Sequence, residues 1–186
     1  FAMWLFSYVP VGRNPDPQLM PTPEQRDQLR RTVAELRETR PMLFIDFWND
    51  GPMISGCMAG GRKYFHINAN GDIEPCVFCH FAVDNIRKTS IRDALASPLF
   101  RMIREKQGTH DNLLRPCMLI DHPDAGREYF SSKGAYPTHE GAEEIFTGLA
   151  TEMDSYARDY QAIADPVWEE QFKDHPLKAR RPGTSK

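Results

Sequence analysis

The chain has 186 residues, 40% of them hydrophobic and 26% charged, with a formal net charge of -3 and a mean hydropathy of -0.56. This composition predicts a soluble globular protein, and no run approaches the ~18 apolar residues that a membrane span needs. The pI near 6.1 argues against nucleic acid as the main partner, because phosphate binding needs a basic face.

The first elements predict a β-α-β unit. Residues 4–9 are apolar and read as a buried strand closed by a proline. Thr22 is a helix cap, and Gln25 can close a capping box, so we expect a helix from Pro23 to about Thr39. A second apolar run, residues 42–47, follows. A strand, a helix and a strand in this order indicate parallel pairing.

The middle of the chain predicts a hairpin and two short helices. Asn70-Gly71 separates two short strand-like runs, and this dipeptide tolerates the positive φ of a tight turn. Ser90 is a cap for a first helix, and Ser97-Pro98 begins a second. The second helix carries the apolar residues Leu99, Phe100 and Ile103.

The C-terminal third predicts a long helix from Thr138 to Asp165-Pro166. Apolar residues recur every three to four positions in it: Ile145, Leu149, Met153, Tyr156, Tyr160 and Ile163. We read this stripe as a packing face. A further short helix would bury Trp168 and Phe172, and the polar tail from residue 173 to 186 is expected to be disordered.

The sequence contains four cysteines: Cys57, Cys76, Cys79 and Cys117. Disulfides are one interpretation, and four cysteines allow three pairings. However, a chain of 186 residues can bury an adequate hydrophobic core without disulfide bonds. The apolar N-terminal stretch lacks the charged n-region and cleavage site of a signal peptide, so we expect a cytoplasmic protein. Four thiols, two of them in C-x-x-C, favour a metal site.

The run "GDIEPCVFCH", residues 71–80, raises three alternatives for that site. Its C-x-x-C-H ending would attach a c-type haem with His80 as axial ligand, but haem leaves Cys57 and Cys117 unexplained and requires export. Zinc ribbons pair two C-x-x-C knuckles, whereas this chain has one. Thiolates from separate loops suit a 4Fe–4S cluster better, and zinc stays the alternative metal.

The spacing Cys57-x13-Gly71-x4-Cys76 resembles the opening of SPASM/twitch auxiliary-cluster domains at the C-terminus of radical S-adenosylmethionine enzymes. The run from Asp84 to Ile91 is similar to that family's run before its two short helices. The resemblance implies an auxiliary 4Fe–4S cluster held by the four cysteines. Such a cluster would transfer electrons or position a substrate in radical modification of an unknown substrate, and electron transfer is favoured if all four thiols bind.

The resemblance also implies the fold and its boundaries. We expect an α+β chain in which residues 1–48 are the terminal β-α-β piece of a partial (β/α) barrel. Residues 49–123 would form the small cysteine-bearing hairpin domain, and residues 124–172 the C-terminal helical segment. On this reading the chain is the C-terminal portion of a longer protein.

One departure from the family limits what the chain can do alone. The C-x-x-x-C-x-x-C motif of the S-adenosylmethionine-cleaving cluster is absent. S-Adenosylmethionine and a second 4Fe–4S cluster are therefore expected only in a radical core, on a missing part of the chain or on another chain. The alternative function is a four-cysteine zinc module that serves as an interaction scaffold without catalysis.

A few further residues are candidates near the site. Arg13 follows a strand end and is a candidate for cofactor or substrate binding. His80 is a candidate ligand or a donor to a cluster sulfur, although an ordinary hydrogen-bonded histidine is the competing interpretation. His66 has a half-buried structural role as its default, and Arg62 could offset the negative charge of a cluster.

Overall fold

In the computed structural model, which describes residues 1–107, 111–132 and 134–176, short sheets and helices mix as expected for α+β. Helix α1 (Pro23–Thr39) confirms the predicted bounds. The Thr22 hydroxyl accepts a hydrogen bond from the Gln25 amide at 3.2 Å, and the Gln25 side chain accepts one from the Thr22 amide at 2.8 Å. This capping box satisfies two donors that the first turn leaves unpaired.

Strand β1 (Ala2–Leu5) precedes α1 in the sequence and β2 (Leu43–Asp46) follows it. The two strands pair in parallel, from Ala2 opposite Leu43 to Leu5 opposite Asp46. The prediction of a buried strand over residues 4–9 is wrong in extent and in burial. Trp4 is 62% exposed and Phe6 50%, and β2 is the only described strand that pairs with β1. The larger partial barrel stays a prediction.

The cysteine region contains little regular structure. It begins with the one-turn helix α2 (Gly51–Ile54). Strands β3 (His66–Ile67), β4 (Asp72–Glu74) and β6 (Asp84–Asn85) form an antiparallel sheet in the order β3-β4-β6. Strand β5 (Phe81–Ala82) pairs antiparallel with the distant β7 (Tyr136–Pro137). Gly71, with φ of 87°, makes the turn between β3 and β4.

Both predicted short helices are confirmed. The Ser90 hydroxyl accepts from the Asp93 amide at 3.1 Å and caps α3 (Ile91–Leu95). Helix α4 (Pro98–Gln107) then buries Leu99, Phe100 and Ile103 completely. Complete burial of side chains of this size stabilises the fold by about 1.5–3 kcal/mol each.

The helix predicted from Thr138 is wrong at its start. Helix α6 (Ala150–Gln171) begins twelve residues later, after the 3-10 turn η2 (Ala142–Phe146). Gly141, with φ of 79°, interrupts a regular helix there. Helix α5 (Pro123–Ser132) was not predicted, although Pro123 at its first position is a recognised signal. A second 3-10 turn, η1 (Pro17–Leu19), lies between β1 and α1 in the sequence.

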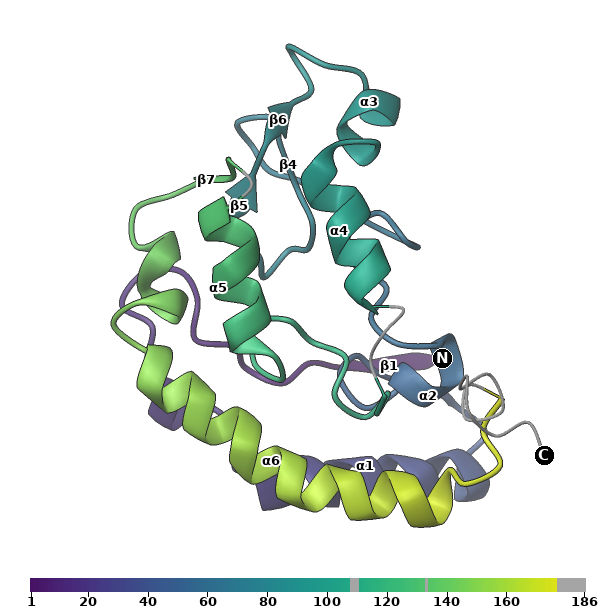
Figure 1. Cartoon of the computed structure of the whole chain (residues 1–186). Coiled ribbons are helices and arrows are strands. Elements are labelled where there is room, and N and C mark those ends of the chain that lie inside the picture. Colours follow the sequence, from purple (N-terminus) through teal and green to yellow (C-terminus); the bar gives the residue numbers. More distant parts are fainter. Residues whose placement is uncertain (108–110, 133, 177–186) are drawn as a thin grey trace, which may run out of the picture.

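Helix α6 also continues through Pro166, where a new helix was expected. Proline removes one backbone hydrogen bond, but Tyr160, Ala164 and Trp168 on both sides of it are buried together with Leu113 and Leu114. Figure 1 shows α6 lying beside α1 along one side of the molecule, with α4, α5 and the small sheets on the other.

The tail that was predicted to be disordered is described only in part. Residues 177–186 lie outside the described residues, while His175 bonds to the Pro52 carbonyl at 2.9 Å. None of the helices in the described part of the chain is long and apolar enough to cross a membrane.

Candidate metal centre

Cys57 lies in a tight loop after α2. Ser55 and Gly56 precede it with φ values of 62° and 100°, which turns the chain sharply. The Arg62 guanidinium donates to the carbonyls of Cys57 at 2.6 Å, Ile54 at 3.0 Å and Gly56 at 3.1 Å. Arg62 therefore fixes the loop that presents Cys57 and places a positive charge beside it.

Cys76 and Cys79 occupy a turn that continues β4 through Pro75. The Cys79 amide donates to the Cys76 carbonyl at 3.0 Å, and the Phe78 amide donates to the Cys76 sulfur at 3.5 Å. The Pro75 carbonyl accepts from the Gly60 amide at 2.9 Å, which holds the Cys57 loop against this turn. Amide-to-sulfur bonds of this kind stabilise a thiolate.

Tyr64 is a site residue that the sequence reasoning missed. Its hydroxyl donates to the Cys76 sulfur at 2.8 Å and accepts from the Val77 amide at 3.2 Å. The pairing register of the hairpin could have identified Tyr64 from the sequence. Because His66 pairs with Glu74, the same antiparallel register places Tyr64 opposite Cys76.

Cys117 is held by the acidic residue that follows it in the turn before α5. Its amide donates to the Asp121 carboxylate at 2.9 Å, and its carbonyl accepts from the Asp121 amide at 2.9 Å. The Asp121 carboxylate therefore positions the backbone of a candidate ligand.

Asp121 in turn pairs with Arg26 of α1. The two charged groups lie 2.6 Å apart, and neither side chain is exposed. The Arg26 guanidinium also donates to the Leu114 carbonyl at 3.1 Å and lies 3.8 Å from the centre of the Tyr160 ring. Arg26 precedes the buried Val33 by two helical turns, so the helix period placed it on the inner face. The pair joins the helical layer to the Cys117 turn.

A small cavity brings three of the four cysteines together. Cys57, Cys76 and Cys117 line it, with a wall otherwise made of Phe47, Trp48, Ile54, Met58, Phe78, Pro116 and Leu119. Cys79 is 2% exposed and packs into the main core behind Cys76. The backbone thus directs all four thiols, from three separate loops, to one region.

Burial controls the protonation of these thiols. It raises the pKa of all four, that of Cys57 to about 12 and that of Cys79 well above its usual value, and neighbouring sulfurs add to the shift for Cys57, Cys79 and Cys117. The protein environment by itself therefore does not stabilise the four cysteines as thiolates. A cation that binds thiolates would supply the missing positive charge.

The donor set fits an iron–sulfur cluster. In the described part of the chain, no group of three or more His, Cys, Asp or Glu side chains is close enough together to hold a single metal ion. A cubane cluster needs no such convergence, because each thiolate binds a different iron. Four cysteine thiolates are the donors that such a cluster uses, and the apolar wall limits access of water to it.

The histidines and Arg13 do not face this cavity. One ring nitrogen of His80 lies 3.1 Å from the Val77 carbonyl, and the other faces His139. His66 lies 2.6 Å from the buried carboxylate of Glu74, in the structural role expected of it. Arg13 lines a different cavity, together with His80 and His139, so its predicted role stays a prediction.

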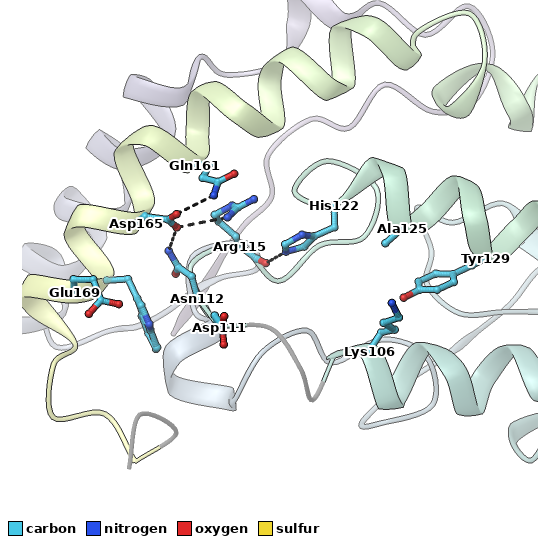
Figure 2. Close-up of a pocket in the computed structure, with 11 residues that line it drawn as sticks. Lys106, Asp111, Asn112, Arg115, His122, Ala125, Tyr129, Gln161, Asp165 and Glu169 are labelled. Atoms are coloured by element: carbon cyan, nitrogen blue, oxygen red, sulfur yellow. Dashed lines mark hydrogen bonds and ion pairs between the residues drawn. The ribbon is translucent and has the colours of Figure 1, made fainter. Parts of the chain in front are cut away.

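A polar cavity of about 550 Å³ lies away from the cysteines, between the segment before Cys117 and helices α5 and α6. Figure 2 shows Asp165 at one side of it, bonded to Asn112 at 2.8 Å and Gln161 at 3.0 Å, with Arg115 at 3.5 Å. No cysteine lines this cavity, so it takes no part in the candidate metal centre.

Comparison with known proteins supports an iron–sulfur site. Residues 57–118 match the family model SPASM, an iron–sulfur cluster-binding domain, and this segment is about a third of the chain. The match confirms the resemblance to SPASM/twitch auxiliary domains. It begins at Cys57 and ends just after Cys117, so it includes all four cysteines. Searches of curated proteins and of solved structures gave no match.

Proposed function

We propose that this chain carries the auxiliary 4Fe–4S cluster of a radical S-adenosylmethionine enzyme, with Cys57, Cys76, Cys79 and Cys117 as ligands. The observation that carries the proposal is that the iron–sulfur family match spans all four cysteines. The cavity between their loops supports it, because the cavity is apolar apart from the sulfurs and has a cationic side chain, Arg62, beside it.

Electron transfer is the favoured role for this cluster. When four thiolates bind a cubane, each iron has a protein ligand, and no iron is open to bind a substrate. A cluster surrounded by apolar side chains and hydrogen bonds to sulfur exchanges electrons with little rearrangement. The Tyr64 hydroxyl and the amide of Phe78 supply such bonds to Cys76. The substrate radical would form on the radical core, in the cytoplasm.

The radical core is the proposed partner of the exposed β1–β2 face. Trp4 of β1 and Leu43 of β2 share one face of the strand pair, and with Phe6, just after β1, they expose 50–62% of their surface. Contiguous apolar surface of this kind marks a site where another protein surface docks. Phe6 also packs on Phe47 with ring centres 5.1 Å apart, so the docking face is continuous with the wall of the cysteine cavity.

Anaerobic reconstitution tests the proposal. The chain is loaded with iron and sulfide without oxygen, and iron, acid-labile sulfide and zinc are measured with the electron paramagnetic resonance spectrum of the reduced sample. We expect about four iron and four sulfide per chain and a signal of a reduced cubane. Stoichiometric zinc without iron in the anaerobic sample would instead support the zinc scaffold. Zinc in an aerobic sample is no contradiction, because zinc occupies vacated thiolate sites.

A further inference from the structure

Two histidines that are 59 positions apart in sequence lie side by side next to the cysteine turn. Strand β5 pairs with β7, with Phe81 opposite Pro137, and the Thr138 amide continues the ladder by donating to the His80 carbonyl at 2.9 Å. The next residue, His139, is thereby brought against His80, with ring centres 4.3 Å apart and planes at 64°. The backbone pairing, rather than a flexible surface contact, sets this meeting.

The outer nitrogen of each ring is already bonded to a carbonyl. His80 Nε2 lies 3.1 Å from the Val77 oxygen, and His139 Nδ1 lies 2.6 Å from the Glu140 oxygen. A carbonyl only accepts, so both of these nitrogens must carry the hydrogen. In two neutral rings the inner nitrogens, His80 Nδ1 and His139 Nε2, then present lone pairs to each other across 2.5 Å. Such a contact is repulsive unless a cation lies between them.

We propose that His80 Nδ1 and His139 Nε2 bind a divalent transition-metal ion of the zinc type, at a site separate from the four cysteines. The carbonyl bonds to the outer nitrogens are what metal-bound histidines use to fix tautomer and ring orientation. Imidazole is a preferred ligand for zinc, copper and nickel. The proposal is independent of the cluster, because neither inner nitrogen faces a cysteine.

The surroundings can accommodate an ion. With Zn–N bonds of about 2.0–2.1 Å, two nitrogens of a tetrahedral site are about 3.3 Å apart, so the rings need to separate by about 0.8 Å. Both rings are half-buried, which leaves room for this movement. The pair lines a cavity of about 770 Å³ together with Glu140 and Glu144. No third His, Cys, Asp or Glu completes the set among the described residues, so water would fill the remaining positions.

A proton shared by the two rings would also relieve the repulsion between the inner nitrogens, and it makes a different prediction from a metal ion. A shared proton would hold one positive charge and exclude metal, whereas a metal ion leaves both rings neutral. The two glutamates favour a doubly charged ion, since their carboxylates reduce the repulsion from Arg13, which lines the same cavity.

Equilibrium dialysis against zinc tests the site. Wild-type chain and the His139→Ala and His139→Gln variants are prepared anaerobically with iron and dialysed at about pH 8, above the ordinary histidine pKa of about 6.5. Zinc and iron are measured in the same samples. We expect wild type to bind about one zinc more than either variant, with at least about tenfold weaker zinc affinity in the variants and unchanged iron. His175→Ala, which removes a histidine elsewhere, should behave as wild type.

Equal zinc binding by wild type and both His139 variants would overturn the proposal, as would zinc uptake that displaces iron. The readout is a difference between wild type and variants, so it does not depend on what occupies the cysteines. Failure of the cluster proposal would appear as missing iron in every sample, and failure of this one as an unchanged zinc count. His139→Gln keeps most of the side-chain volume, and thermal unfolding of each variant verifies its fold.

Discussion

The helical layer and the cysteine loops of this molecule are held together by different means. Helices α1 and α6 pack against each other, with Arg26 over the Tyr160 ring, and Arg26 forms a buried ion pair with Asp121. The cysteine loops have strands of two or three residues and a one-turn helix, joined by single backbone bonds such as Gly60 to Pro75. Packing therefore supports the first region, whereas the second depends on whatever binds its thiols.

This contrast predicts different responses to loss of the cluster. A bound metal contributes its binding free energy to folding only where the ligands are otherwise weakly organised. The helical layer and α4 should keep their structure without iron, while the loops that carry the cysteines should loosen. Asp121 connects the two regions, because it accepts from both Arg26 and the Cys117 amide.

The largest expected effect is that of Cys76→Ala. It removes a thiolate at the end of β4, and we expect the chain to lose most of its iron and to unfold at the temperature of iron-free wild type. Val77→Ala is the matched control, since Val77 lies in the same turn but is 41% exposed. Iron analysis and thermal unfolding check both. Full iron content in Cys76→Ala would contradict its assignment as a ligand.

Asp121→Ala should give the next largest effect, on the helical layer itself. It leaves the Arg26 guanidinium buried without its partner, which destabilises by about 3–5 kcal/mol. Asp27→Ala removes the partly exposed pairs that Asp27 forms with Arg30 and Arg31 of the same helix, and it should cost less than Asp121→Ala. Urea unfolding of iron-free protein measures both. Similar small losses for the two variants would show that the buried pair does not support this layer.

Gly60→Ala should have a smaller effect, confined to the cysteine loops. Gly60 has φ of 68°, and an added Cβ would meet the side chain of Ile103. The left-handed conformation alone destabilises alanine by about 1–2 kcal/mol, and the contact adds to this. Gly12→Ala is the comparison, since Gly12 has φ of 91° with nothing within 4 Å of the added Cβ. The same urea series should show a greater loss for Gly60→Ala, and equal losses would mean that the contact is relieved freely.

Tyr64→Phe should have the smallest effect on stability, at most about 1 kcal/mol, because it removes one hydrogen bond. It should nevertheless lower the reduction potential of the cluster, since a hydrogen bond to sulfur favours the more negative reduced state. A potentiometric titration followed by electron paramagnetic resonance measures the shift. An unchanged or higher potential would remove Tyr64 from the environment of the cluster.

Local signals predicted the fold well where they were complete. The cap and proline of α1, and the serine caps before α3 and in front of α4, gave correct helix starts because they act within one turn. The apolar stripe after Thr138 gave a wrong start, because periodicity alone does not report the strand β7 or the turn at Gly141. Those depend on pairing with β5, far away in sequence.

The sequence likewise identified some residues of the candidate site and missed others. Cysteine spacing pointed to all four thiols, and the structure brings their loops together. Tyr64 could have been found by extending the hairpin register from the turn at Gly71. Neither the pairing of Asp121 with Arg26 nor that of His139 with His80 could be found, because 95 and 59 positions separate the partners. Only tertiary structure brings such residues together.

The central claim, that one cluster uses all four cysteines, is tested most directly by comparing Cys57→Ala with His80→Ala. Iron and acid-labile sulfide are measured per chain after anaerobic loading, beside wild type. We expect Cys57→Ala to lose most of its iron and sulfide, and His80→Ala to retain both, because the ring nitrogens of His80 lie against the Val77 carbonyl and His139 and not against a cysteine sulfur. Full iron and sulfide in Cys57→Ala together with their loss in His80→Ala would contradict the four-cysteine cluster.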